Sequence, residues 1–277
     1  MATWDFACSD PIDVSVSNWI AGSIVVSGHP TSSVVVEVVA NHRNAELVDQ
    51  VQVAFEDGQL SVQGPRVPTF RRWQGLHLTI KAPPGSTCAA RTVSADLSCV
   101  GDISAVSLHT ASGDLTAASV GEVAMRSASG DALLNRVTGT LFVHTASGDV
   151  SATRTDGEVR INSASGDVAI GYSGGPVAVH TASGDVQLGA VGAGRVELAS
   201  TSGDLCVAVM PGLGVYLDLV SHSGNVRSEL DADDAANSEG QSSVAEPDAS
   251  LRVTCRTTSG DIKITKSGVA PSELARA

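Results

Sequence analysis

The sequence predicts an all-β protein: a single-stranded parallel β-helix, or β-solenoid, with 18-residue coils of two short strands each. Three observations predict it. The tripeptide Ser-Gly-Asp, or a close copy, recurs at near-constant spacing; a second row of glycines halves the period; and apolar and polar residues alternate between the glycines. A fixed period of this length is typical of solenoid proteins.

The recurring tripeptide sets the period. From one of its glycines to the next, the steps are 17, 18, 18, 18, 19, 21 and 36 residues. The last step equals two periods, which predicts one copy there that has lost its signature, and Ser94-Ala95-Asp96 resembles a degenerate first copy. We assign the following residues to the corners of the coils: Gly113, Asp114, Gly130, Asp131, Gly148, Asp149, Gly166, Asp167, Gly184, Asp185, Gly203, Asp204, Gly224, Asn225, Gly260 and Asp261.

Each coil divides into two halves of nine residues, because Gly121, Gly139, Gly157, Gly175 and Gly194 each precede a corner glycine by nine. Between the glycines, apolar residues occupy alternate positions, as in strands with one buried face. The predicted inward row is Val123, Met125, Leu141, Val143, Val150, Ala152, Val159, Ile161, Val168, Ile170, Val177, Val179, Val186, Leu188, Val196, Leu198, Leu205, Val207, Ile262 and Ile264.

The corner residues have a structural interpretation. Glycine is required where the chain turns with positive φ or where stacked backbones approach closely, and Asp or Asn beside it can accept hydrogen bonds from backbone N–H groups. A Ser or Thr three residues before each glycine has inward parity, and we expect these hydroxyls to form a ladder in which each bonds the next coil. They are Thr110, Ser127, Thr145, Ser163, Thr181, Ser200, Ser221 and Thr257.

Two metal sites are alternatives to this interpretation. The aspartate column would place carboxylates about 5 Å apart, but Ca²⁺ takes 6–8 oxygen ligands, and the GGxGxD order of calcium-binding repeats does not occur. His109, His144 and His180 recur in alternate coils, about 10 Å apart, which is too far for one zinc ion with bonds of about 2 Å. We therefore expect no metal, no cofactor and no cofactor-binding or catalytic residue.

The two ends differ from the regular repeat of residues 94–265. Residues 1–93 are strand-rich but irregular and hold all three tryptophans, which predicts broad early coils and an aromatic cap. Residues 228–250 carry seven acidic and no basic residues, which predicts a mobile loop that interrupts the stack. Residues 266–277 form a C-terminal tail.

One basic and aromatic patch is a candidate contact for a partner or a peripheral membrane surface. It lies in residues 64–75 and consists of Arg66, Phe70, Arg71, Arg72 and Trp73.

Charge and composition exclude several classes of partner. The net charge of −13 disfavours nucleic acid and anionic lipid surfaces as main partners. No signal peptide and no apolar run of about 18 residues is visible. The five cysteines are odd in number and widely spaced, which is typical of reduced thiols, so we expect a cytoplasmic protein.

The words TASGD and SASGD at 18-residue spacing, with WIAGSIVVSG (19–28) and LHLTIKAPPGS (76–86), resemble a bacterial family. It is the putative-adhesin β-strand-repeat family, a domain of unknown function grouped with the toastrack domains of envelope-stress proteins. The resemblance covers about residues 10–265. It implies a non-catalytic β-solenoid that acts as a scaffold or interaction module, and it offers no catalytic residues to transfer.

The functional expectation is a non-enzymatic module that binds protein, including another copy of itself, through its walls or ends. Two alternatives are a cation-dependent, adhesin-like module and a carbohydrate-active β-helix. The last would need clustered carboxylates with a Lys or Arg in a cleft, and the repeated wall has only Phe142 as an outward aromatic residue.

Overall fold

The computed structural model describes residues 1–40, 45–65, 75–230 and 250–268. Every regular element among them is a β-strand, except the four-residue helix α1 (Ala45–Val48). The chain is therefore all-β, as predicted. It divides into two compact units, Met1–Gly139 with Val143–Gly148 and Thr140–Phe142 with Asp149–Ala277, which we call the N-terminal and C-terminal units.

The N-terminal unit contains ten complete strands among its described residues. They are β1 (Ala2–Ala7), β2 (Asp13–Gly28), β3 (Ser33–Val39), β4 (Gln52–Glu56), β5 (Gln59–Gln63), β6 (Leu76–Ala82), β7 (Ser86–Gly101), β8 (Ile103–His109), β9 (Leu115–Arg126) and β10 (Ala132–Val137). The division between the units falls within β11 (Leu141–Thr145).

Parallel pairing dominates this unit. The long strand β2 pairs with β5 through its first half and with β6 through its second half, and β7 pairs with both halves of β2. Strands β7 to β10 continue the parallel pairing: β8 pairs with β7, β9 pairs with both β7 and β8, and β10 pairs with β9. Leu115 on β9 pairs with Leu97 on one side and with Ala132 on the other, so residues about one period apart lie side by side.

The first strands depart from the expected broad coils, because β1 pairs with β3, β3 with β6, and β4 with β5 in antiparallel fashion. Asp57 and Gly58, between β4 and β5, have φ values of 48° and 75°. Two consecutive positive φ angles characterise a type I′ hairpin turn, which Asp-Gly favours. The sequence therefore carried a hairpin signal at this position that the solenoid interpretation missed.

The aromatic residues of this region take two different roles. Trp19 is 1% exposed and its Nε1 donates to the Leu76 carbonyl at 3.3 Å, so it belongs to the core. Phe6 and Phe55, on β1 and β4, are half-buried and their ring centroids lie 5.3 Å apart. Because β1 and β4 each pair with one strand only, these two rings lie on the outermost strands of the unit.

The C-terminal unit contains eleven complete strands among its described residues. They are β12 (Val150–Thr155), β13 (Val159–Ser163), β14 (Val168–Ser173), β15 (Val177–His180), β16 (Val186–Val191), β17 (Gly194–Ser202), β18 (Leu205–Val209), β19 (Val215–Ser223), β20 (Val226–Ser228), β21 (Leu251–Ser259) and β22 (Ile262–Lys266).

These strands form two parallel ladders. In one, β12, β14, β16 and β18 pair in turn, and in the other β13, β15 and β17 do so. Val168 pairs with Val150 and Val186, each 18 residues away, and Val186 pairs with Leu205, 19 residues away. Every residue of the predicted inward row is at most 2% exposed. The period-two pattern therefore predicted the core correctly.

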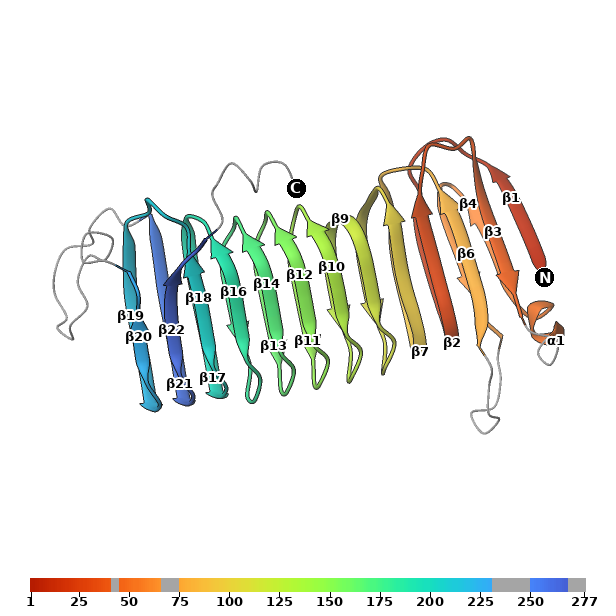
Figure 1. Cartoon of the computed structure of the whole chain (residues 1–277). Helices are drawn as coiled ribbons and strands as arrows, with labels where there is room; N and C mark the ends of the chain where they lie inside the picture. The colour runs from red at the N-terminus through yellow and green to blue at the C-terminus, as the bar shows by residue number, and fades with distance from the viewer. Residues whose placement is uncertain (41–44, 66–74, 231–249, 269–277) are drawn as a thin grey trace. The chain divides into compact units, whose positions relative to one another are not determined.

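The last coils do not stack in chain order. Strand β21 pairs with β17 on one side and with β19 on the other, and β22 likewise pairs with β18 and with β20. The coil Leu251–Lys266 thus lies between the coil that precedes residue 210 and the coil Val215–Ser228 (Figure 1). The 36-residue step between Gly224 and Gly260 therefore does not mark a lost coil between neighbours; the two glycines already belong to adjacent coils.

Inner-row composition explains this order. The intercalated coil has an unbroken apolar row whose members, such as Leu251, Val253 and Ile264, are 0% exposed. The outermost coil has Ser228 at the position that pairs with Ile264, and its Leu217 and Leu219 are only half-buried. A coil covered on both sides buries more apolar area than one covered on a single side, so the more apolar coil is better placed inside.

Three cysteines lie in the core as free thiols. Burial raises the pKa of Cys99 and of Cys255 to about 12, with the nearby Asp218 adding to the effect on Cys255. Burial, and next the proximity of Cys99, raises the pKa of Cys88 well above its ordinary value. Because the thiolate is the reactive form, these three side chains are apolar filling rather than nucleophiles.

The coil order predicts different costs for two leucine truncations. Leu251→Ala should lower the free energy of unfolding by about 2–5 kcal/mol, as for other buried leucines. Leu217→Ala should cost less than half as much, because Leu217 already contacts solvent. Urea unfolding followed by circular dichroism measures both. Stacking in chain order would bury Leu217 between two coils, so a Leu217 loss equal to or larger than that of Leu251 would contradict the observed order.

Candidate functional site

Glycine is required at the corners because backbones of adjacent coils approach closely, not because φ is positive. The positive-φ glycines of the described chain lie elsewhere, for example at Gly22 and Gly101. A Cβ on Gly184 would lie closer to the carbonyl oxygen of Gly166 than van der Waals contact allows. A Cβ on Gly203 would clash with the carbonyl oxygen of Gly184 in the same way. The corner glycines therefore set the distance at which coils stack.

The corner aspartates connect one coil to the next. In the C-terminal unit, the Asp167 amide donates to Asp149 Oδ1 at 2.9 Å, and the Asp185 amide donates to Asp167 Oδ1 at 2.9 Å. The ladder continues through Asp204, Asp261 and Asn225, each amide donating at 2.8 Å to the preceding carboxylate in the stack. In the N-terminal unit the amides of Asp114 and Asp131 donate in the same way to Asp96 and Asp114, at 3.1 and 2.9 Å.

The hydroxyl row differs in part from the predicted ladder. Thr110, Ser127 and Thr145 accept from the amide of the glycine three residues later, at 2.8, 2.7 and 3.0 Å, and so close their own turns. Where a hydroxyl reaches a neighbouring coil, it donates to a backbone carbonyl, as Ser221 does to Gly260 at 2.9 Å. Three members have no hydrogen-bond partner within the described residues: Ser163, Thr181 and Ser200. Within each unit the aspartates, rather than the hydroxyls, bond each coil to the next along the stack.

The histidines that were considered as an alternative metal site lie at the surface or partly buried, and the candidate partner contact lies outside the described residues. His109 is half-buried, whereas His144 and His180 are exposed. No group of three or more His, Cys, Asp or Glu side chains suited to a metal ion occurs in residues 1–40, 45–65, 75–230 and 250–268. The patch formed by Arg66, Phe70, Arg71, Arg72 and Trp73, and most of the acidic loop predicted at 228–250, lie outside the described residues.

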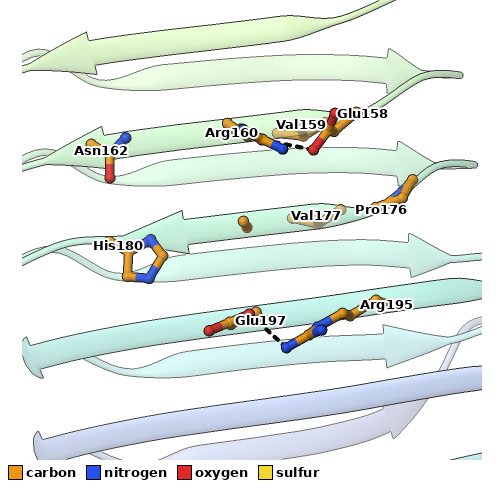
Figure 2. Close-up of a pocket in the computed structure, with 10 residues that line it drawn as sticks. Glu158, Val159, Arg160, Asn162, Pro176, Val177, His180, Arg195 and Glu197 are labelled. Carbon is orange, nitrogen blue, oxygen red and sulfur yellow. Dashed lines mark hydrogen bonds and ion pairs between the residues drawn. The ribbon is translucent and has the colours of Figure 1, made fainter.

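A hollow of about 400 Å³ lies on the outer wall of the C-terminal unit, over β13, β15 and β17 (Figure 2). Its floor is the outward face of β15, where the short side chain of Ala178 lies between Arg160 on β13 and Glu197 on β17. An alanine between two long side chains leaves the space that forms the hollow. The lining residues are Glu158, Val159, Arg160, Asn162, Pro176, Val177, Ala178, His180, Arg195 and Glu197.

Two ion pairs border the hollow, one on each flanking strand (Figure 2). Arg160 Nε lies 2.7 Å from Glu158 Oε1, and Arg195 Nη2 lies 3.1 Å from Glu197 Oε2. The side chains of these four residues are 41–65% exposed, so solvent screens both pairs. This arrangement can contact a partner surface through charges of both signs.

In the sequence, Arg160 and Glu197 are polar residues that lie between inward apolar positions, Val159 and Ile161 for one and Val196 and Leu198 for the other, so they are distinguished only by their outward parity. The signal that could have revealed the hollow is a small residue, Ala178, one repeat after Arg160 and one repeat before Glu197, both of which have long side chains. The charge order is also reversed between the flanking strands: Glu158 precedes Arg160, but Arg195 precedes Glu197.

The chain belongs to the Toastrack DUF4097 family, whose model covers most of its length. The model of the Toastrack DUF4097 family matches residues 13–190 and, in an overlapping second match, residues 158–265. A comparison with curated proteins finds no match. In the part of the chain that the structure describes, no helix has the length and apolar character needed to cross a membrane.

Several solved structures resemble the chain at low identity. A putative adhesin from Bacteroides fragilis is 12% identical with a TM-score of 0.43, and the match covers 95% of this chain and 96% of that one. A putative adhesin from Parabacteroides merdae is 11% identical with a TM-score of 0.38, covering 96% of each chain. A putative lipid binding protein from Parabacteroides distasonis is 12% identical with a TM-score of 0.38, covering 95% and 96%.

Adding one methyl group at a corner should destabilise the stack. Gly184→Ala places a Cβ against the Gly166 carbonyl, and the required shift should cost about 1–3 kcal/mol, as for other overpacked sites. Gly268→Ala is the matched control, because a Cβ there meets no atom within 4 Å, and it should change stability by less than about 0.5 kcal/mol. Thermal and urea unfolding measure both, and equal effects would show that close approach does not constrain the corner.

The aspartate ladder should depend on an acceptor oxygen rather than on charge. Asp167→Asn keeps the oxygen that accepts from the Asp185 amide, so it should leave stability nearly unchanged. Asp167→Ala removes that oxygen and should cost about 1 kcal/mol, the usual net value of such a bond. Unfolding of the two variants in the same buffer makes the comparison, and a loss in Asp167→Asn as large as in Asp167→Ala would contradict the ladder.

Proposed function

We propose that the protein is a non-catalytic scaffold that binds other protein surfaces through the outer wall of its β-solenoid. The observation that supports this most strongly is the use of the recurring polar residues. The corner aspartates, which sequence alone could assign to metal binding or catalysis, accept backbone amides of adjacent coils. Their hydrogen bonds maintain the stack, and the side chains of the outer wall are the groups presented to a partner.

We also propose the detailed architecture that the sequence and its resemblance to the putative-adhesin family predict. It consists of a single-stranded parallel β-helix with 18-residue coils over residues 94–265, an irregular strand-rich region over residues 1–93 that caps it, and a C-terminal tail in residues 266–277. Parallel pairs separated by 17 to 19 residues support the coil length, for example Leu115 with Ala132 and Val186 with Leu205.

The cellular setting is also a proposal. Free thiols at Cys88, Cys99 and Cys255 are compatible with a reducing compartment, and we propose a cytoplasmic protein. The link to envelope stress comes from the family resemblance alone. Cell fractionation with an antibody against the chain tests the compartment, and recovery outside the cytoplasm would contradict the assignment. Gene deletion tests the link to envelope stress, and an unchanged envelope-stress response would contradict it.

Site-specific photo-crosslinking tests the binding role. A benzophenone amino acid replaces Ala178 on the wall of the C-terminal unit or Leu133, an outward residue of β10 that is 58% exposed. We expect ultraviolet-dependent crosslinks to a defined protein from at least one of these positions. The same protein should then bind the purified chain.

A buried position provides the control. Benzophenone at Val179, which is 0% exposed, should give no crosslink to another protein if it folds, and cells without irradiation control for background. Absence of any protein crosslink from both wall positions would contradict the proposed role.

A further inference from the structure

The four charged residues around the hollow alternate in sign. Strand register places Arg160 opposite Glu197 across Ala178, and Val159 opposite Val196 across Val177. Two residues earlier in the chain, the outward positions are Glu158 next to β13, Pro176 next to β15 and Arg195 on β17. Around the hollow the charges therefore read Glu158 negative, Arg160 positive, Glu197 negative and Arg195 positive (Figure 2).

This pattern has regular spacing. Residues two apart on a strand are separated by about 6.7 Å, and strands two apart in the sheet by about 9.6 Å. The four charges therefore mark the corners of a rectangle whose adjacent corners are opposite in sign and whose diagonal corners are alike.

Such a rectangle is complementary to a copy of itself. A two-fold axis in the plane of the wall, parallel to β15, brings Glu158 over the partner copy's position 195 and Arg160 over its position 197. An in-plane axis perpendicular to β15 brings position 158 over position 160 and position 195 over position 197. In both orientations each carboxylate meets a guanidinium, as an isologous interface requires.

We propose that this wall, over β13, β15 and β17, is the surface through which two copies of the chain associate face to face. The inference rests on the proposed binding role and names the partner as a second copy. An anionic or cationic ligand would meet attraction and repulsion in alternation around the hollow, whereas a second copy gains attraction at all four corners. The small floor residues Pro176 and Ala178 leave room for the long side chains between the two walls.

The contact is electrostatic, so salt should weaken it. The four side chains are 41–65% exposed in the isolated chain, and bonding across the interface replaces or supplements the pairs within each strand. The Debye length is about 14 Å at 50 mM salt and falls to about 4 Å at 500 mM. The dimerisation constant should weaken at least about fivefold over this range, measured by sedimentation velocity of the purified chain.

Paired charge variants provide the decisive test. Arg160→Glu with Arg195→Glu makes all four corners acidic, and Glu158→Arg with Glu197→Arg makes all four basic. Each variant alone should be at least tenfold weaker in self-association than the natural chain, whichever axis is used. An equimolar mixture should restore a dimer, because acidic corners then face basic ones.

Non-specific attraction between chains of opposite net charge would not explain a dimer in this mixture. The natural chain carries −13, and each variant changes that value by four, so both variants remain net negative. Circular dichroism melting curves of both should match the natural chain, because the substituted side chains are exposed. A variant that melts early is replaced by the matching glutamine variant, Arg160→Gln with Arg195→Gln or Glu158→Gln with Glu197→Gln, which should also weaken self-association.

The outcomes separate this inference from the proposed function. Dimerisation of the mixture, with each variant alone monomeric, supports the face-to-face interface. A natural chain that stays monomeric at millimolar concentration, variants that associate like the natural chain, or a mixture that does not pair would overturn it. If the self-association tests fail, crosslinking from position 178 or position 133 to a different protein would still uphold the binding role. Absence of any crosslink together with a monomeric natural chain would contradict both.

Discussion

The close approach of corner backbones between adjacent coils is the constraint on which the rest of the structure depends. Only glycine allows the carbonyl oxygen of one corner to lie where a Cβ of the next would otherwise be, as between Gly166 and Gly184. Once the corners are at this distance, strands pair in parallel, inward valines and leucines form continuous columns, and each corner amide reaches the carboxylate of the preceding coil. Core packing and corner hydrogen bonding thus follow from the same spacing.

The stacking arrangement determines which polar groups are available for function. The corner carboxylates are solvent-exposed but already bonded to backbone amides, and the buried cysteines have pKa values shifted away from reactivity. The variable part of each coil is the outward row of its strands, where one coil carries Arg160, the next Ala178 and the next Glu197. A repeat protein of this kind can change its surface without disturbing its core, since outward and inward residues alternate along each strand.

Coil order shows where a repeat pattern stops predicting structure. Every coil presents the same parallel edge and a similar inner row, so the pattern permits any coil to stack on any other. The intercalation of Leu251–Lys266 between earlier coils follows from burial, because its isoleucines and leucine gain more from two neighbours than Ser228 of the competing coil would. The hairpin at Asp57 and Gly58 is the opposite case, since a local turn signal overrides the parallel scheme.

The sequence by itself determined the all-β class, the period and the inward row, because glycine spacing and two-residue alternation are local properties of a strand and its turns. Only the tertiary structure decided the coil order and the charge pattern around the hollow. A strict 18-residue shift would place Val196 opposite Ala178, but the 19-residue step pairs Val177 with Val196 and so brings Glu197 beside Ala178. Burial of Val177 and Val196 sets that register, because a slip of β17 by one residue would turn Val196 toward solvent.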